Sequence, residues 1–311
     1  MSFRLLSFQP TDGRAPRAGL QVNNAVVDLE AAVNRENQSF AVKTGTNLSS
    51  VLAVVQNWDI LLPLLEAASD NIASMETKPL EKVKCLAPLL YPTNIFCAAA
   101  NYQDHFKEMS GKEADKTKFK PYFFTKAPHQ TVIGTGAPIL RPKVTEMMDW
   151  EVEIAVVIGR SGRNIKLKDA MDHVAGYTII NDLSARNFLK RPDWPNMSSD
   201  WLWQKTFDTS APMGPWITPK SEIADPHNLF LKTWVNDTLE QDTHSKHMVF
   251  TIPEQIHALS EHFTLLAGDV IATGTGGGVG HKKGRYLNPG DTCRLEIEGL
   301  GELTNPIIGG K

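Results

Sequence analysis

The stretch MDWEVEIAVVIG, residues 148–159, has the pattern of a strand that is buried on both faces. Successive strand residues face opposite ways, so Glu151 and Glu153 share one face, together with Ala155 and Val157. The run IAVVIG is apolar on both sides, which is typical of a strand between packed layers. Two neighbouring carboxylates buried there repel each other and need a positive partner. A hard divalent cation such as Mg²⁺, Mn²⁺ or Ca²⁺ would supply it, because these ions prefer carboxylate oxygens.

Two other interpretations of this stretch are open on the residues alone. It could be an edge strand whose glutamates face water, or Lys and Arg side chains could pair with the carboxylates. A third acidic side chain nearby would favour the cation. Asp182 ends the apolar run of GYTIIND, residues 176–182, and could be that ligand. Equally, Asn181 and Asp182 could begin a turn or cap a helix near Ser184.

Length and composition describe an ordinary globular protein. The 311 residues suffice for one large domain or two smaller ones, and 41% hydrophobic with 22% charged residues is typical. The formal net charge of -3 and the pI near 6.3 give no basic surplus, so we expect no nucleic-acid partner. No stretch reaches the length needed to span a bilayer, so we expect no membrane association.

The cysteines indicate a reducing compartment. Cys85, Cys97 and Cys293 are scattered and lack CxxC spacing, which argues against a disulfide scaffold and against a thiolate zinc site. The first residues contain no apolar signal core. We therefore expect a cytoplasmic protein, with mitochondrial import as the alternative.

The opening of the chain predicts a small mixed module. Residues 3–8 and 20–28 have the pattern of two short strands around a Gly/Pro-rich turn, and residues 49–69 look helical. A charged stretch with a proline follows at 76–86. We place a boundary there and predict an N-terminal α+β module over residues 1–80.

The rest of the chain, residues 81–311, is richer in strand signals. From about Leu86 onward, short β-rich runs are separated by Gly, Pro and Asp turns. They include residues 94–101, 121–126, 151–159, 175–182 and 293–299. The sequence therefore predicts an α+β fold that is mostly β.

A histidine and a glutamate three residues apart could form a proton-transfer pair. One turn of helix would put His105 and Glu108 of NYQDHFKEM on the same side. A carboxylate near imidazole raises its basicity and fixes its tautomer, which suits a general base acting on water. The alternative is a pair on a surface helix with no catalytic role. Residues 108–120, which follow, are so polar that we expect them on the surface.

Three basic residues are candidates for binding a substrate carboxylate or a developing oxyanion. Lys205 lies among aromatic residues in WLWQKTF, and Lys126 ends the apolar PYFFTK. Each could instead be a surface lysine whose stem covers apolar neighbours. Arg186, four residues after Asp182, could hold a carboxylate with its two-pronged guanidinium or only brace the site.

The glycine-rich segment IATGTGGGVGHKKG, residues 271–284, does not fit a known nucleotide motif. It lacks the GxxxxGK[ST] spacing and contains no GxGxxG. We expect a tight loop whose backbone amides, with Thr275, approach a ligand. No GxSxG or HExxH motif supports a serine hydrolase or a zinc protease.

Six blocks in order along the chain carry a resemblance to one family. They are NYQDHFKE (101–108), DWEVEIAVVIG (149–159), AGYTIINDLSAR (175–186), KTFDTSAPMGPW (205–216), VN and Q within WVNDTLEQ (234–241), and GDVIATGTGGGVG (268–280). Together they strongly resemble the fumarylacetoacetate hydrolase family, and the N-terminal module resembles that family's opening region. The resemblance implies that family's mixed β-sandwich roll for the main domain.

The resemblance also implies roles for individual residues. Glu151, Glu153 and Asp182 would bind Mg²⁺ or Mn²⁺, with Ca²⁺ as a substitute in crystals. His105 and Glu108 match the family's water-activating dyad, and the segment after them matches a lid that closes over ligand in relatives. Lys205 matches the family's active-site lysine and would be catalytic together with that dyad. Gly274 and Thr275 belong to the ATGT block, which contacts the substrate carboxylate in the family.

This chain departs from the family pattern at three places. Gly276 stands where relatives usually have a proline. Asn187 and Leu189 stand where they often carry Asp and then Gln, so a polar substrate contact would be missing. The span RPDWPNMSSDWLW, residues 191–203, is rich in Trp and could wall the pocket with apolar surface.

The function that we predict first is metal-dependent hydrolysis of a carbon–carbon bond in a β-diketo acid such as an acylpyruvate or fumarylpyruvate, giving a carboxylic acid and a keto acid. The alternatives are decarboxylation of oxaloacetate and keto–enol or double-bond isomerisation of a hydroxymuconate-like diacid. A metal-stabilised binding protein without turnover is a further alternative. The resemblance implies a homodimer, with tetramers in some relatives.

Overall fold

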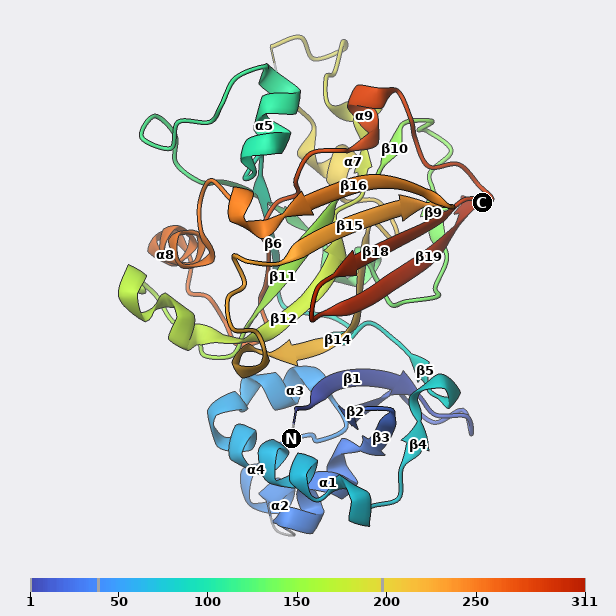
Figure 1. Cartoon of the computed structure of the whole chain (residues 1–311), viewed down its shortest axis with the longest axis vertical. Helices are drawn as coiled ribbons and strands as arrows, with labels where there is room; N and C mark the ends of the chain where they lie inside the picture. The colour runs from blue at the N-terminus through green and yellow to red at the C-terminus, as the bar shows by residue number, and fades with distance from the viewer. Residues whose placement is uncertain (1, 38–39, 197–198, 311) are drawn as a thin grey trace.

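A long mixed sheet runs through the computed structural model, which describes residues 2–37, 40–196 and 199–310 (Figure 1). The strands follow the order β4-β3-β2-β1-β14-β12-β11-β17-β6-β7, with β5 on β1 and β8 on β14. Their bounds are β1 (Arg4–Gln9), β2 (Arg17–Val22), β3 (Ala25–Asp28), β4 (Lys78–Pro79), β5 (Lys84–Cys85), β6 (Ile95–Ala99), β7 (Tyr122–Lys126), β8 (Val132–Ile133), β11 (Val152–Ile158), β12 (Val174–Asn181), β14 (Ala211–Pro219) and β17 (Val270–Ala272).

Two smaller sheets accompany the long one. A five-stranded sheet of order β16-β15-β18-β19-β9 lies across the front of β11 and β12 in Figure 1. Its strands are β9 (Ile139–Arg141), β15 (Phe230–Val235), β16 (Thr238–His244), β18 (Thr292–Ile297) and β19 (Gly301–Gly309). A two-stranded ladder pairs β10 (Met148–Asp149) with β13 (Ser184–Ala185).

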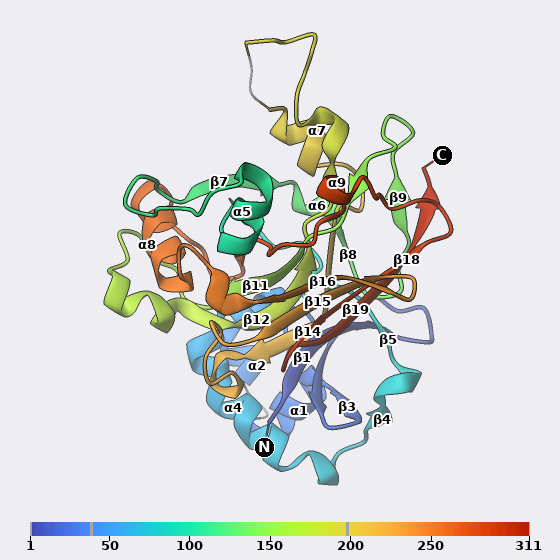
Figure 2. The ribbon, with the colours of Figure 1, turned by 45° about the horizontal axis from the view of Figure 1, so that its top comes forward.

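The helices are short and fall into two groups (Figure 2). The N-terminal group is α1 (Leu29–Glu36), α2 (Phe40–Thr44), α3 (Val51–Gln56) and α4 (Trp58–Asp70), and the later group is α5 (Gln103–Ser110), α6 (Pro128–Thr131), α7 (Trp201–Lys205), α8 (Ile252–His262) and α9 (Gly280–Lys283). Single 3₁₀ segments are η1 (Ile72–Ser74), η2 (Leu80–Lys82), η3 (Leu167–His173), η4 (Arg186–Phe188), η5 (Lys220–Glu222) and η6 (Ser245–His247). Among the described residues, no helix is both long enough and apolar enough to cross a bilayer.

The N-terminal module differs in detail from the sequence prediction. Residues 20–28 form parts of two strands, because Asn23 adopts a left-handed conformation with φ 51° and turns β2 into β3. The helix predicted over 49–69 divides at Asn57, whose side chain donates to the carbonyl of Ala53 and so ends α3. The module joins the long sheet through the pairing of Leu5 with Ile217. The boundary near residue 80 stays a prediction.

Strand β11 is buried on both faces, as the alternation of its residues predicted. Ala155 and Val157 pack into a core shared with the N-terminal helices. Ile154 and Val156 pack into a second core between the long sheet and the five-stranded sheet. The expectation of an α+β fold with more strand than helix is confirmed. The two cores leave the start of β11 fixed, and this is where the glutamates lie.

Candidate active site

The pairing of β11 with β12 brings the three predicted acidic ligands together. These strands run antiparallel in a register that pairs Val152 with Asn181, so Glu151 lies across from Asp182. The amide of Asp182 donates to the carbonyl of Glu151 at 3.0 Å, and the side chain of Asn181 accepts from the amide of Glu151 at 3.0 Å. Asn181 and Asp182 therefore extend the strand pairing and do not cap a helix.

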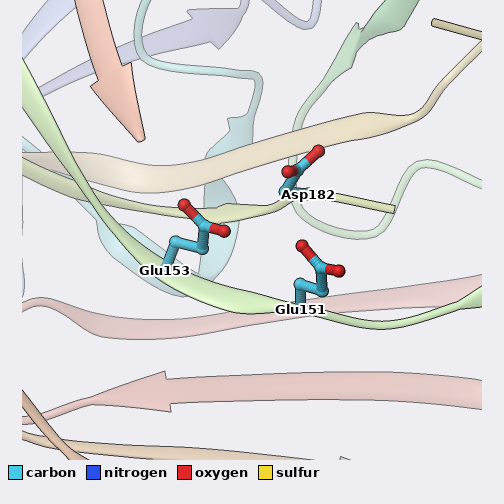
Figure 3. A group of neighbouring side chains, drawn as sticks. All are labelled: Glu151, Glu153 and Asp182. Atoms are coloured by element: carbon cyan, nitrogen blue, oxygen red, sulfur yellow. The ribbon is translucent and has the colours of Figure 1, made fainter. Parts of the chain in front are cut away.

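The three acidic side chains lie near one another in Figure 3. One oxygen from each of Glu151, Glu153 and Asp182 lies within 4.8 Å of the others, and all three residues are at most 5% exposed. Oxygen donors at this spacing around one point are what a hard divalent cation requires. The convergence follows from alternation along β11 and from the register with β12.

Two of the three carboxylates already have cationic partners. The Nζ of Lys205 lies 2.8 Å from Glu151 Oε2 and 2.7 Å from Asp182 Oδ2, while the Nζ of Lys126 lies 2.6 Å from Asp182 Oδ1. Arg186 Nη2 donates to Glu151 Oε1 at 2.6 Å. Burial alone would raise the pKa of Glu151, but Lys205 and Arg186 hold that pKa well below its usual range. The pairing by Lys and Arg that the sequence left open is therefore present at these two residues.

Glu153 is different, because no Lys or Arg of the described chain pairs with it. Within the described part of the chain, its Oε2 accepts a hydrogen bond from the backbone amide of Gly274, at 2.7 Å. Burial, followed by the negative charges of Asp182 and Glu151, raises the pKa of Glu153 well above its ordinary value. The same charges would be offset by a bound dication.

A fourth acid, Asp149, belongs to the same cluster and was missed by the sequence analysis. Arg186 Nε donates to Asp149 Oδ2 at 2.8 Å, and the amides of Gly280 and His281 also donate to this carboxylate. The guanidinium of Arg186 thus bridges Asp149 and Glu151 and braces the site. The alternation that links Glu151 and Glu153 extends back to Asp149 and was the available signal.

The charges of the cluster suit a divalent cation. Four buried carboxylates (Asp149, Glu151, Glu153 and Asp182) face three buried cations (Lys126, Arg186 and Lys205). With all four carboxylates ionised, the cluster has one surplus negative charge. A bound dication would change its net charge to +1, which would favour an anionic ligand. Glu151, Glu153 and Asp182 are the residues that would hold the ion.

Helix α5 carries the predicted dyad beside this cluster. His105 Nδ1 lies 3.6 Å from Glu108 Oε2, an ion-pair distance, and has no hydrogen-bond partner among the described residues. Burial would raise the pKa of Glu108, but His105 and the amide of Gly278 lower it below the usual value. Glu108 is therefore a charged neighbour that can hold the His105 ring.

Asp104 fixes the start of α5 to the rest of the molecule. Its carboxylate accepts from the amide of His105 at 2.9 Å and from the hydroxyl of Thr243 at 2.5 Å, and it lies 3.4 Å from His247 Nδ1. Burial would raise its pKa, yet the Thr243 hydroxyl and the amides of Gly277 and His105 lower it. The dyad thus depends on a carboxylate that precedes it in sequence.

The glycine-rich loop positions acidic side chains through its amides. The amide of Gly274 donates to the carboxylate of Glu153, and the amide of Gly278 donates to that of Glu108. The hydroxyl of Thr275 donates to the carbonyl of Val152 at 2.8 Å. Gly276 approaches β16 so closely that an added Cβ would lie 2.2 Å from Thr243 Oγ1. Only glycine fits there.

A cavity of about 240 Å³ joins the two sets of residues. Glu151, Glu153, His105 and Lys205 line one part of it. The other part is mostly apolar, and its walls come from Phe106, Met109, Phe124, Leu189 and Trp201. Lys126 is only 1% exposed and is absent from the lining, so in this structure it contacts Asp182 and not the cavity.

The Trp-rich span contributes one wall of the cavity and not more. Trp201 lines the cavity and stacks on Phe124 with ring centroids 4.8 Å apart, whereas Trp194 and Trp203 are exposed. Residues 197–198 of the span lie outside the described residues. Gln204 also lines the cavity and was not singled out from the sequence, because no spacing rule distinguishes it from its neighbours.

Comparison with known proteins points to one family. The model of the fumarylacetoacetate (FAA) hydrolase C-terminal region matches residues 94–308. The mitochondrial oxaloacetate tautomerase fahd2 of Xenopus laevis is 35% identical over 312 residues, covering 99% of this chain and 91% of that protein. Oxaloacetate tautomerase YisK of Bacillus subtilis (strain 168) is 44% identical over 234 residues, covering 73% of this chain and 74% of that protein.

A solved structure agrees with this comparison. The maleylpyruvate hydrolase from Sphingobium sp. SYK-6, in complex with a manganese(II) ion and pyruvate, aligns with a TM-score of 0.76 at 27% identity. The alignment covers 99% of this chain and 100% of that one. The similarity therefore extends over the N-terminal module as well as the main domain.

Proposed function

Because this chain belongs to the fumarylacetoacetate hydrolase family, we propose that it is a divalent-cation-dependent enzyme that interconverts the keto and enol forms of oxaloacetate or a similar 2-oxo acid. The observation that carries the proposal is the buried triad of Glu151, Glu153 and Asp182, whose two glutamates line a small cavity together with His105. The relatives named as oxaloacetate tautomerases support the reaction. They favour the isomerase alternative over carbon–carbon hydrolysis, which the sequence analysis predicted first.

The size of the cavity supports a small substrate. About 240 Å³ is below the roughly 300–1,000 Å³ typical of sites for drug-sized ligands. The surplus negative charge of the cluster would be reversed by Mg²⁺ or Mn²⁺ held by the triad, and the site would then attract the carboxylate of an oxo acid. A bound dication supplies Lewis-acid polarisation of the oxo group, which makes the neighbouring C–H more acidic.

The residues of the chain would move the proton. With Nδ1–H of His105 directed at Glu108, Nε2 is free to take a proton from C3 of the keto form and to return one to the enol oxygen. Lys205, held between Glu151 and Asp182, adds fixed positive charge near the developing enolate. The apolar walls from Phe106 and Met109 limit water in the site.

Carbon–carbon hydrolysis of an acylpyruvate or maleylpyruvate-like substrate is the second candidate. It is favoured by the similarity to a maleylpyruvate hydrolase and by the His105–Glu108 pair, which could equally activate water. The two reactions differ in where His105 acts: on the C3 proton in a tautomerase, and on water at the distal carbonyl in a hydrolase.

A substrate panel tests the proposal. Purified protein with Mg²⁺, with Mn²⁺ or with chelator is mixed with the enol form of oxaloacetate, and the loss of enol absorbance is followed. Acylpyruvate cleavage and CO₂ release from oxaloacetate are measured in parallel. We expect metal-dependent ketonisation well above the uncatalysed rate. Cleavage of acylpyruvates without ketonisation would establish the hydrolase instead, and metal binding with no turnover would indicate a binding protein.

The predicted assembly also remains a proposal. We expect at least a homodimer, which light scattering after size-exclusion chromatography would measure directly.

A further inference from the structure

Gln204 places an unpaired amide in the candidate active site. It lies on α7, three residues after Trp201 and one before Lys205, and these three side chains face the same cavity. Gln204 is 1% exposed, and its Oε1 has no hydrogen-bond partner among the described residues. Buried side-chain oxygens are usually hydrogen-bonded, so an unpaired one in a cavity indicates a missing ligand.

The lysine and the arginine that line the cavity are engaged in ion pairs. Lys205 contacts Glu151 and Asp182, and Arg186 contacts Asp149 and Glu151. Gln204, although next to Lys205 in the chain, has no hydrogen bond to any of these carboxylates. Its amide is therefore a polar group that remains available to a ligand.

The surroundings of Gln204 indicate which part of a ligand it meets. Phe124 and Leu189, which also line the cavity, offer no hydrogen bond to a second polar end of a substrate, and Trp201 offers only its indole N–H as a donor. An amide among such side chains can donate to a carboxylate or carbonyl oxygen, and after a half turn it can accept from a hydroxyl. It does this without adding charge.

We propose that Gln204 binds the oxygen-bearing end of the substrate that is remote from its 2-oxo acid head. This assigns to the site 2-oxo acids with a second carboxylate or carbonyl group, in preference to those that end in an alkyl group. The inference rests on the proposed function, because it takes the oxo-acid head to lie at the triad of Glu151, Glu153 and Asp182.

Inert ligands test this role apart from catalysis. Malate and lactate are 2-hydroxy acids that share the same head, and malate alone has a second carboxylate; neither has a 2-oxo group to enolise. Binding of each to the Mg²⁺-loaded protein is measured by calorimetry. We expect malate to bind more tightly than lactate. Gln204→Leu should lower the affinity for malate by about tenfold, because a hydrogen bond to a charged group is lost, and should leave the affinity for lactate unchanged.

Two further variants guard against a structural explanation. Gln204→Glu keeps the shape of the side chain and adds a negative charge that repels the second carboxylate of malate. The affinity for malate should therefore fall at least as much as in Gln204→Leu. Gln255 is a matched control: it is fully buried with an unpaired Oε1, but it lies on α8 outside this cavity. Gln255→Leu should leave both affinities unchanged.

The outcomes separate this inference from the proposed function. Equal weakening of malate and lactate in both Gln204 variants, or no preference for malate in the unaltered protein, would overturn the role of Gln204. A preference for malate that depends on Gln204, found in a protein that does not ketonise oxaloacetate, would retain the inference and reject the proposed reaction. If the protein ketonises oxaloacetate but Gln204→Leu does not change the affinity for malate, the proposed reaction stands and the role of Gln204 is rejected.

Discussion

Two sets of residues at the cavity are held in place differently. The carboxylate wall is Glu151 and Glu153, which line the cavity, with their neighbour Asp182, and the α5 wall is His105, which lines it, with its neighbour Glu108. The carboxylate wall lies at the paired ends of β11 and β12, between two apolar cores, and ion pairs fix two of its three side chains. The α5 wall is one short helix near the surface (Figure 2). Its anchors are hydrogen bonds from loops and from the neighbouring β16.

Because of this difference, we expect cation binding at the carboxylate wall and proton transfer at the α5 wall to be separable by mutation. A cation site built into a sheet is already formed before the ligand arrives, so little ordering is needed when the ion binds. A proton-transfer group on a helix with few anchors can be displaced while the cation site stays intact. We therefore expect changes in the carboxylate wall to abolish binding, and changes in α5 to lower the rate while binding persists.

The largest effect is expected from Glu153→Gln. The substitution keeps the shape but removes the one triad charge without a cationic partner, so metal affinity and activity should both fall by roughly 10³-fold or more. The metal-free variant should be more stable than the unaltered protein, because an unpaired buried carboxylate is costly. Calorimetric titration with Mn²⁺ and thermal unfolding in chelator measure the two effects.

Glu261, an exposed residue of α8, is the matched control for Glu153. Glu261→Gln should change neither metal affinity nor stability. If Glu153→Gln bound Mn²⁺ as tightly as the unaltered protein, the carboxylate wall would not be the cation site.

The second prediction concerns the α5 wall. His105→Asn should lower kcat by about 10²–10⁴-fold, the usual contribution of a general acid–base group. Mn²⁺ affinity and malate affinity should stay within about twofold, because His105 is not among the triad. Steady-state kinetics and calorimetry on the same preparation measure both, with exposed His262→Asn as control. Loss of metal binding in His105→Asn would show that the two walls are not independent.

A third prediction tests the ion pairs of the carboxylate wall. Lys205→Met leaves Glu151 and Asp182 without a shared cation, and breaking a buried pair in this way costs about 3–5 kcal/mol of unfolding free energy. The loss should be greatest in chelator and should shrink when Mg²⁺ is added, because a dication offsets the same two charges. Urea unfolding with and without Mg²⁺ measures this difference. An equal loss in both conditions would mean that the metal does not bind at these carboxylates.

The sequence predicted the carboxylate wall better than the contacts around it. Alternation along β11 requires only that a strand forms, and it placed Glu151 and Glu153 together. The cations could not be predicted in the same way: Lys126 and Asp182 are 56 positions apart, and their contact depends on where the sheet places the end of β7 relative to the end of β12. The division of the predicted N-terminal helix depended on one side-chain hydrogen bond from Asn57, which competes with the helix.

The α5 wall illustrates a second limit of the sequence. The three-residue spacing of His105 and Glu108 was sufficient to propose a dyad on one helical turn, and α5 carries both. Nothing local marks Asp104 as the residue that ties this helix to Thr243, because that contact joins positions 139 apart. Asn and Asp near a helix start are common, and their tertiary partners become visible only in the fold.

The smallest effect is expected from Asp104→Asn, which weakens the contacts that hold α5 but leaves the residues of both walls unchanged. Losing the charged acceptor for the amide of His105 and the hydroxyl of Thr243 should cost about 1–2 kcal/mol of stability and lower kcat by about tenfold. Metal affinity should not change.

The effect of Asp104→Asn should depend on pH. Because the fold lowers the pKa of Asp104, the contribution of this carboxylate to the free energy of unfolding is present above the unfolded value of about 3.9 and is lost as the pH falls through the folded pKa. The stability difference between Asp104→Asn and the unaltered protein, measured by urea unfolding, should therefore be larger at pH 7 than at pH 3.5. A drop in Mn²⁺ affinity equal to the drop in kcat would mean instead that α5 and the triad form one cooperative unit.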